Sequence, residues 1–442
     1  MNALHAAALA ASLSIASGAA AQQPAPTSPE PTREQLQQEL ADLKARIAKL
    51  ESRDAQQQAA SSPQTKSEVL SDAQRRSALT QPAPLTAGYD KGFFIRSDDG
   101  HFLFKPSAFF QFRYVANAGE DAAGDDEIDS GFELRRTRFR FDGNAFSPNF
   151  TYSFVFDTER SGGSVLLLDA WGQYQFAKDW AVKFGQFKES VFHERDVAPT
   201  NQLAVDRTLV DAVLGGNNTN RVQGVALVYG GGKADDVRAE FALHDGANSR
   251  NTNFQDQAAG DWGVGARGEW KVGGDWANYR DFTAHGTKQP LFVLGAGADL
   301  TQAGDVDILR AAADAQWENA KGWGLYGAVH GNQTDAGDAG DTFDWGALAQ
   351  AGYLLNKKVE VFGRYDILRL DDVAPGDEDT FNELTIGANY YLGPDGAYLH
   401  RAKLTFDVVY LPEGAPSTQT GLGILGSDED QFVFRGQFQL QI

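Results

Sequence analysis

The sequence predicts an all-β transmembrane barrel of about 16 antiparallel strands, preceded by a short α-helical coiled coil. From His101 onward, apolar and polar residues alternate over runs of ten or more, the length that a tilted strand needs to cross a bilayer. Short turns alternate with long polar loops along the same region. The mean hydropathy is −0.39, yet the chain holds 29 Phe, 13 Tyr, 8 Trp and 47 Gly. A polar average with many aromatic residues is typical of a barrel whose every second side chain faces water.

Composition excludes several classes of protein. Beyond the first few dozen of the 442 residues, no run is long and apolar enough for a transmembrane helix. The abundance of aromatic residues excludes disorder over most of the chain. A formal charge of −21 argues against nucleic acid as a partner, and the absence of Cys excludes disulfides and thiolate metal sites. We expect no cofactor and no metal site.

Residues 1–21 read as a secretory signal peptide. An apolar core runs from Ala6 to Ile15, and the small residues Ala19 to Ala21 supply a cleavage site before Gln22. The usual Lys or Arg at the start is missing, so a disordered Ala-rich tail stays an alternative. Residues 22–31, rich in Pro, Ser, Thr and Gln, form a predicted linker.

Residues 32–54 carry the predicted coiled-coil helix. Thr32 and Gln35 match a capping box. Five apolar residues follow at alternating spacings of four and three, the period of a coiled coil: Leu36, Leu40, Leu43, Ile47 and Leu50. So short a helix is marginal alone, so we expect copies to associate as a homotrimer and the coiled coil to contact peptidoglycan. A lone amphipathic helix is the alternative, and residues 55–92 are a predicted linker.

The barrel is expected over residues 93–442. In its first long strand Phe102, Phe104, Ala108, Phe110, Phe112 and Tyr114 share one face, and Lys105, Ser107, Gln111 and Arg113 share the other. Short turns are expected near residues 147–149, 177–179, 319–322 and 356–357. Long polar loops are expected over 116–130, 187–220, 245–260, 331–341, 369–379 and 411–430. Trp180, Trp262, Trp270, Trp317, Trp323 and Trp345 fall near strand ends, where aromatic girdles lie.

Arginines mark one strand as a candidate for solute contact. Arg136, Arg138 and Arg140 point the same way in an unbroken strand, and burying arginine against lipid costs about 2–4 kcal/mol at mid-membrane, so they must face the lumen. Arg135 falls on the other phase, so either a bulge turns it inward or it lies at the rim. Guanidinium groups suit oxyanions such as phosphate. The alternative is that the arginines pair with lumenal acids such as Asp157 or Asp169 and only fill the wall.

The longest loop, residues 187–220, is the candidate to fold into the lumen. It follows the fifth predicted strand and mixes both charge signs, including Lys188. Its apolar residues suggest packing against the wall: Val205, Leu209, Val210, Val213 and Leu214.

Several segments resemble the phosphate-selective porin O/P family of bacterial outer-membrane porins. They are Gly185 to Lys188, Asp206 to Ala212, the arginine-rich second strand, Asp169 to Trp171 and the coiled-coil leader. The resemblance spans residues 93–442 and implies a sixteen-stranded trimeric anion channel with a constriction formed by the third loop. Arg135 and Arg136 match the family's paired pore arginines, and Arg113 matches one from the first strand. Unlike the family's phosphate channels, the loops are rich in Asp, so the substrate stays open.

We therefore expect a porin of the Gram-negative outer membrane, in contact with lipid and lipopolysaccharide and with its N-terminal segment in the periplasm. It would pass small anions, phosphate or related oxyanions, by passive diffusion. The predicted pore residues are Arg135, Arg136, Arg138, Arg140, Arg113, Lys105 and Lys188. A general or cation-preferring porin, and a structural protein linked to the cell wall, are the alternatives. An enzyme is not expected, because the His residues are scattered singly and form no catalytic motif.

Overall fold

The computed structural model describes residues 33–60, 85–90, 92–120, 126–215, 221–230, 232, 235–255, 260–371, 373, 378–427 and 429–442. The predicted signal peptide (1–21) and first linker (22–31) lie outside these residues. The chain divides into two compact units, residues 1–82 and 83–442, which are described separately. Among the residues described, no helix is both long and apolar enough to cross a membrane.

The first unit contains one helix, α1, from Arg33 to Ala60. Its side chains at Leu43, Ile47 and Leu50 are 58%, 52% and 63% exposed, so no described residue of this unit covers this part of the apolar stripe. The predicted linker from residue 55 was wrong over its first six residues, because the helix continues through them. They are Ala and Gln, which favour helix, and Pro63 follows shortly after.

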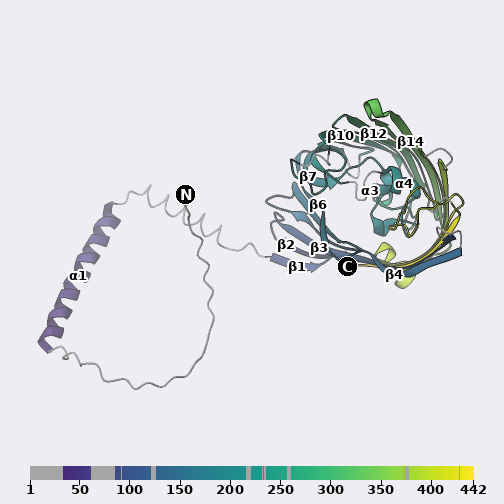
Figure 1. Ribbon diagram of the computed structural model, residues 1–442. Helices are drawn as coiled ribbons and strands as arrows, with labels where there is room; N and C mark the ends of the chain where they lie inside the picture. Colours follow the sequence, from purple (N-terminus) through teal and green to yellow (C-terminus); the bar gives the residue numbers. More distant parts are fainter. Residues whose placement is uncertain are drawn as a thin grey trace, which may run out of the picture. The chain divides into compact units, whose positions relative to one another are not determined.

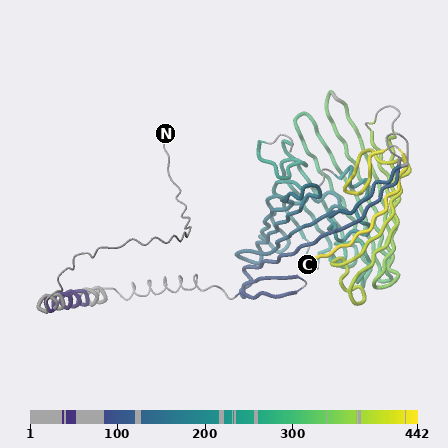
Figure 2. Tube along the Cα trace, turned by 60° about the horizontal axis from the view of Figure 1, so that its bottom comes forward, coloured from purple at the N-terminus to yellow at the C-terminus, as the bar shows by residue number. Residues whose placement is uncertain are grey.

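Sixteen antiparallel strands of the second unit close into a barrel, in which β18 pairs with β3 (Figure 1). Their bounds are β3 Leu103–Glu120, β4 Asp126–Asn144, β5 Phe150–Thr158, β6 Val165–Ala177, β7 Trp180–Lys188, β8 Arg221–Gly230, β9 Val237–His244, β10 Trp262–Gly273, β11 Leu291–Ala303, β12 Val306–Glu318, β13 Trp323–Asp335, β14 Asp341–Leu354, β15 Val359–Arg369, β16 Thr380–Tyr391, β17 Ala402–Leu411 and β18 Gln431–Gln441. The strands run tilted along the wall (Figure 2). The predicted closed barrel is confirmed.

A small hairpin precedes the barrel. β1 (Leu85–Tyr89) pairs with β2 (Phe93–Ser97), and β2 joins β3 through two residue pairs. The end of the predicted linker 55–92 therefore contains a strand, which its short length and the turn beside Gly92 concealed.

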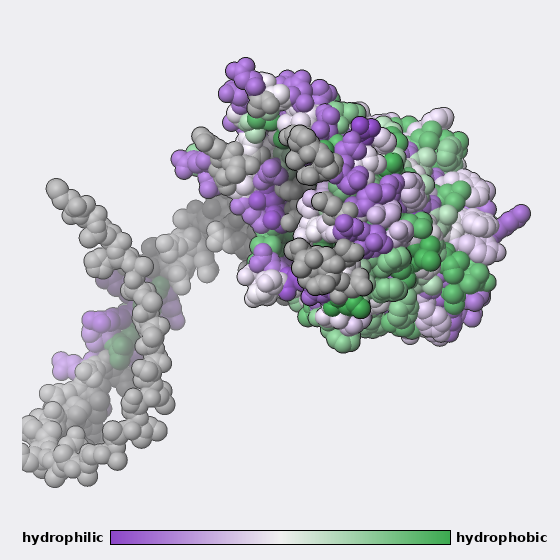
Figure 3. Space-filling view, turned by 45° about the vertical axis from the view of Figure 1, so that its right-hand side comes forward, coloured by the Kyte–Doolittle hydropathy of each residue, from purple (hydrophilic) through white to green (hydrophobic). Residues whose placement is uncertain are grey.

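Alternation along each strand separates the two faces of the wall. Phe132, Leu134 and Phe139 of β4 are 72%, 55% and 44% exposed and point outward, whereas Arg136 is 6% exposed and points into the lumen. The outer wall carries broad apolar areas (Figure 3). This pattern is that of a barrel in lipid with a polar interior.

The connections depart from the predicted pattern in four places. The predicted long loop 331–341 is reduced to residues 336–340, because β13 runs to Asp335 and β14 begins at Asp341. Most of the predicted loop 116–130 is strand, since β3 and β4 are 18 and 19 residues long and exceed the ~9–11 residues that cross a bilayer. Their polar ends read as loop because beyond the lipid both faces meet water. At the same end, β11 and β12 join through only Gly304 and Asp305. At the opposite, short-turn end, residues 274–290 make a long connection between β10 and β11.

Candidate functional site

The lumen holds a long segment between β7 and β8, which we call the constriction loop (residues 189–215 as described). It contains α3 (His193–Asp196), a 3-10 turn η1 (Pro199–Asn201) and α4 (Leu209–Leu214). Both α-helices lie inside the ring of strands (Figure 1). The prediction that this loop folds into the pore is confirmed.

The wall fixes α4 through its exposed N-terminal amides. Leu209 N–H donates to Glu383 at 2.9 Å, and Val210 N–H donates to Asp366 at 3.1 Å. Carboxylates at a helix N-terminus satisfy orphan donors and oppose the positive end of the dipole. Thr208 caps the helix by accepting from Asp211 N–H at 3.0 Å. The loop is therefore attached by charge-assisted bonds to β15 and β16.

Apolar side chains of the constriction loop also pack against the part of the wall near β15 and β16. Leu209, Val210 and Leu214 of α4 join one buried cluster with side chains of β15 to β18. Val197, Leu203 and Ala204 join another with Phe282 and with side chains of β13 to β15. These contacts place the loop against β13 to β18, so open space remains beside β4 to β10.

A bulge in β4 turns Arg135 into the lumen. The register shifts so that Gln111 pairs with Arg136 and Phe112 with Leu134, which leaves Arg135 as the extra residue. Arg135 and Arg136 therefore both face the lumen. The bulge is one of the two arrangements that the sequence allowed, and it is confirmed.

Three arginines converge on Asp206 of the constriction loop. Arg113 Nη1, Arg135 Nε and Arg136 Nη2 lie 2.7, 2.9 and 2.6 Å from its carboxylate. Burial alone would raise the pKa of Asp206, but the three guanidinium groups outweigh it and hold that pKa well below its ordinary value. Asp206 thus ties the loop to β3 and β4 and neutralises part of their charge.

A cavity of about 700 Å³ opens between the loop and the wall beside Asp206. We call it the basic chamber, because nine Arg or Lys and four Asp or Glu side chains line it. The basic residues are Arg135, Arg136, Arg138, Arg160, Lys188, Arg195, Arg207, Arg221 and Arg250. The acidic ones are Asp157, Glu159, Asp206 and Asp211.

Several of these cations are incompletely neutralised. Arg138 pairs with Asp157 at 2.7 Å and Arg221 with Asp169 at 2.9 Å. In contrast, Lys188 Nζ donates to the main-chain oxygens of Arg195 and Asp196 at 2.5 and 3.1 Å, and these oxygens carry no full charge.

Arg207 and Arg250 add to the excess of positive charge in the basic chamber. Arg207 donates to the main-chain oxygens of Glu194, Arg195 and Val197 and lies 4.0 Å from Asp211. Burial and the nearby guanidinium of Arg221 lower the pKa of Arg250, as expected where positive charges crowd together. Even when Glu133 and Asp169 behind the lining are counted, positive charge prevails in the chamber.

A second cavity, of about 610 Å³, lies on the other side of α3. We call it the lower chamber. Arg238, Arg267 and Arg280 face Asp196, Glu240 and Glu269 there, and Tyr229 and Tyr279 complete the lining with smaller residues. Its charges balance, in contrast to those of the basic chamber.

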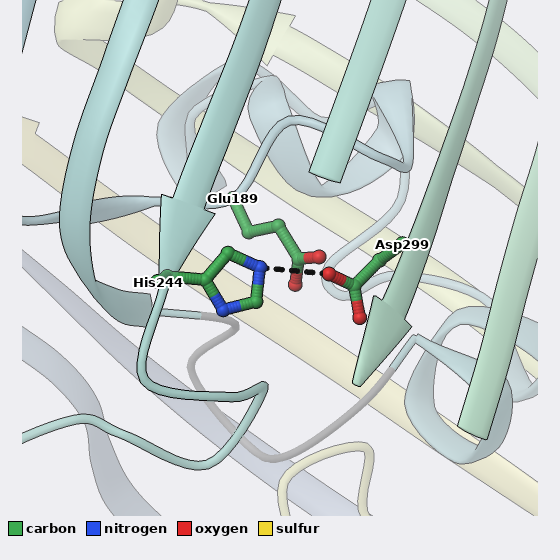
Figure 4. Close-up of side chains that lie close together, drawn as sticks. All are labelled: Glu189, His244 and Asp299. Atoms are coloured by element: carbon green, nitrogen blue, oxygen red, sulfur yellow. Dashed lines mark hydrogen bonds and ion pairs between the residues drawn. The ribbon is translucent and has the colours of Figure 1, made fainter. Parts of the chain in front are cut away.

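Glu189, His244 and Asp299 meet at the start of the constriction loop and point toward one another (Figure 4). His244 Nε2 lies 2.8 Å from Asp299, and Arg310 lies 2.8 Å from Asp299 and 3.5 Å from Glu189. Burial and the neighbouring Asp299 raise the pKa of Glu189 to about 8, although Arg310 opposes them. One imidazole and two carboxylates are donors that metals accept. Here Arg310 already supplies the positive charge, so we interpret the group as an anchor of the loop.

Comparison with known proteins agrees with this geometry. The family model "Phosphate-selective porin O and P" matches residues 110–338, just over half of the chain. The chain belongs to this family. It is therefore a porin of the Gram-negative outer membrane, a channel rather than an enzyme. No curated protein matches the sequence.

Solved structures share the fold of this porin. The anion-selective porin of Comamonas acidovorans aligns with a TM-score of 0.55 at 12% identity, over 77% of this chain and 100% of that one. The outer membrane channel DcaP of Acinetobacter baumannii aligns at 0.51 and 12%, over 81% and 100%. Salmonella typhi OmpF, solved with daunomycin, aligns at 0.51 and 13%, over 80% and 100%. Identities this low show the fold alone.

The predicted pore residues of the porin divide into two groups. Arg135, Arg136, Arg138 and Lys188 line the basic chamber. Arg113, Arg140 and Lys105 do not line it. Arg113 is fully buried and pairs with Glu133 and Asp206 behind the chamber, so it stabilises the wall.

The other two residues lie toward the short-turn end of the wall. Arg140 pairs with Asp142 at 2.6 Å, and Lys105 lies opposite Asp142 in the register.

Sequence reasoning missed five basic residues of the chamber: Arg160, Arg195, Arg207, Arg221 and Arg250. They come from four segments, so no local spacing connects them. Arg195 and Arg207 were visible as charges of the lumenal loop, but their orientation depends on its fold. Nothing in the sequence brings Arg250 of the β9–β10 loop near β4.

Proposed function

We propose that this porin passes small oxyanions, of which inorganic phosphate is the model solute, through the basic chamber. The observation that carries the proposal is the excess of positive side chains, nine against four, around a cavity of about 700 Å³. An anion entering the chamber exchanges water for several guanidinium groups, whose paired donors match oxyanion geometry. Chloride would follow the same field without the paired hydrogen bonds.

The carboxylates in the chamber keep binding weak enough for transport. Conduction requires a site that attracts the solute and also releases it. Asp157 and Asp206 already accept from Arg138 and Arg135, and Asp211 forms an ion pair with Arg195, so an oxyanion competes with resident carboxylates. We infer that the solute moves between partly neutralised arginines and is not held by one fully open site.

The same proposal includes the orientation of the porin in the membrane and its assembly. The long-loop end would face the cell exterior and the short-turn end the periplasm, where α1 would associate with copies from two other chains. The exposed Leu43, Ile47 and Leu50 support such association, since they present apolar side chains at coiled-coil spacing. Contact with lipopolysaccharide at the outer rim and with peptidoglycan near α1 completes the proposed setting.

The test is phosphate block of the chloride current in a planar bilayer. The Arg138→Gln and Arg250→Gln variants should each require several-fold more phosphate for half block, since each removes a chamber cation. Arg140→Gln is the matched control, because Arg140 lies two residues from Arg138 on the same strand but outside the chamber. Equal phosphate sensitivity in all three variants and the native protein would contradict the proposed site.

A further inference from the structure

The long connection at the short-turn end, residues 274–290, folds into the lumen. Trp276, Tyr279 and Phe282 are 4%, 1% and 2% exposed, which is unusual for a surface turn. Arg267 Nη2 donates to Tyr279 Oη at 3.1 Å, and Phe282 packs against Tyr326 with ring centroids 4.7 Å apart. We call this segment the lower loop.

The lower loop contacts the constriction loop from the short-turn end of the barrel. Asn201 Nδ2 donates to the main-chain oxygen of Arg280 at 3.0 Å. The ring of His193 stacks on Tyr279 with centroids 3.9 Å apart. The lower loop therefore narrows the mouth that the constriction loop leaves open, and Tyr279 and Arg280 line the lower chamber.

Carboxyl groups of the wall hold the lower loop from two sides. Thr287 Oγ1 donates to Glu318 of β12 at 2.7 Å, and Thr283 Oγ1 donates to Glu360 of β15 at 2.7 Å. Both Glu side chains are buried completely. The side chain of Asp281, in the lower loop itself, is only 16% exposed. Its carboxylate lies 3.5 Å from His400 Nε2. Three carboxyl groups thus share one nearly dry region.

Few positive charges face these groups. Lys403 of β17 is the buried cation beside Asp281 and Glu360, and its Nζ also donates to the main-chain oxygen of Gln202 at 2.6 Å. The other facing groups that titrate are His285 of the lower loop, His400 of the β16–β17 turn and Tyr391 of β16. Burial lowers the pKa of His400 well below its ordinary value, so it is neutral near pH 7.

Two glycines in the left-handed region bound the buried stretch. Gly274 and Gly286 have φ of 89° and 85°, conformations that other residues rarely adopt, and they flank the buried stretch. Between them the loop is attached by the polar contacts described above, by the ring of Phe282 and by a buried cluster in which Trp276 and Tyr279 pack with Leu291 and Val293. Trp276 Nε1 also donates to the main-chain oxygen of Asp235 at 2.7 Å, and Gln316 Nε2 donates to that of Asp281 at 2.6 Å.

We propose that the lower loop is a pH-sensitive lid on the periplasmic mouth, closed while Asp281, Glu318 and Glu360 are protonated and released as they ionise. The proposal rests on the proposed function as a pore but not on its anion preference. When all three groups ionise, three negative charges lie in this largely buried region, where Lys403 is close to Asp281 and Glu360 only, and the loop moves out to restore hydration.

The direction with pH follows from Asp281. Burial raises the pKa of Asp281 to about 7, despite the opposing Thr283 amide and Lys403. A group whose pKa is higher in the closed state favours closure at low pH, and this preference is lost as the pH rises from the ordinary pKa toward the raised one. The lid should therefore be shut near pH 5 and largely open near pH 8.

Thiol labelling tests the lid without any measurement of transport. The chain has no Cys, so Ala284→Cys reports on the lower loop, and Ala204→Cys, equally buried in the constriction loop, is the matched control. From pH 5 to pH 8 the Ala284→Cys labelling rate, corrected for thiol ionisation, should rise at least tenfold, and that of Ala204→Cys should not. Equal changes at both positions would overturn the proposal.

Two further variants keep the test independent of misfolding. Glu318→Gln with Glu360→Gln keeps the acceptors but cannot ionise, so the labelling of Ala284→Cys in that background should lose most of its pH dependence. A reversible thiol crosslink between Asn201→Cys and Arg280→Cys should abolish the pH-dependent rise in conductance until reductant is added. A rise that survives the crosslink would contradict the lid, and a pore without phosphate block would contradict only the proposed function.

Discussion

Asp206 shows how much a single residue determines in this pore. Its carboxylate accepts from Arg113, Arg135 and Arg136, which come from both strands at the start of the barrel. The residue therefore decides where the constriction loop lies and how much of the arginine charge remains for a solute. The sequence drew attention to Arg135 and Arg136 but gave no sign that a loop carboxylate seventy residues away would occupy them.

Replacing Asp206 by Asn should release the constriction loop. Arg135 and the buried Arg136 would lose their carboxylate and Arg113 would keep only Glu133, and breaking a buried pair in this way costs about 3–5 kcal/mol. The free energy of unfolding should fall accordingly and channel noise should rise. Millimolar phosphate should restore part of the stability, because a free oxyanion can take the place of the carboxylate.

The control for this variant is Asp142→Asn. Asp142 pairs with Arg140 where the side chains are 36% and 51% exposed, and such surface pairs contribute about 0–1 kcal/mol.

Since the pKa of Asp206 lies well below its ordinary value, the native network should persist at neutral pH and weaken only as the pH falls below about 4. Native channels that become noisy already at pH 6 would contradict this account.

At the scale of elements, period-two alternation predicted the strands because one face of each strand meets lipid. It failed where that contrast disappears, as at residues 116–130, where both faces of β3 and β4 meet water. It also gave no warning of the lower loop, whose inward fold depends on Glu318 and Glu360 from distant strands. The bulge at Arg135 could be deduced, because an arginine on the wrong phase must leave the lipid.

Gly185 of β7 provides a test of close packing between elements. Its φ is 116°, and a Cβ there would lie 2.3 Å from the main-chain oxygen of Ala170 on β6. Gly185→Ala should therefore destabilise the barrel by about 1–3 kcal/mol. It should lower the temperature at which the folded band disappears on electrophoresis.

The matched substitution is Gly268→Ala on β10, where a Cβ would have open space. That variant should keep the native transition temperature. Equal loss of stability in both variants would mean that glycine content, and not the contact with β6, limits the barrel.

At the scale of the whole molecule, the barrel could be predicted from the sequence, whereas assembly remains a prediction. The helix Arg33–Ala60 presents exposed apolar residues at coiled-coil spacing. The chamber is likewise a property of the whole molecule, since its cations come from β4, the constriction loop, β7, β8 and two other loops. Such a combination is decided by closure of the barrel, which no local pattern specifies.

Substitution of the apolar stripe should weaken assembly. Leu43→Ser with Ile47→Ser removes two core positions of the predicted coiled coil and should reduce the crosslinked trimer several-fold in native membranes. Ala45→Ser with Ala48→Ser changes the same helix away from the stripe and should leave the trimer unchanged. Equal crosslinking in both variants would show that α1 does not contribute to assembly.

The central claim is that the basic chamber, and not the acidic loops, sets the charge preference of the pore. The most direct measurement is the reversal potential of the native porin in a planar bilayer under a tenfold KCl gradient. The account predicts a potential of the sign set by chloride, which moves toward zero in the Arg138→Gln and Arg250→Gln variants. A potential of the sign set by potassium would contradict the account and would mean that the acidic loops govern permeation.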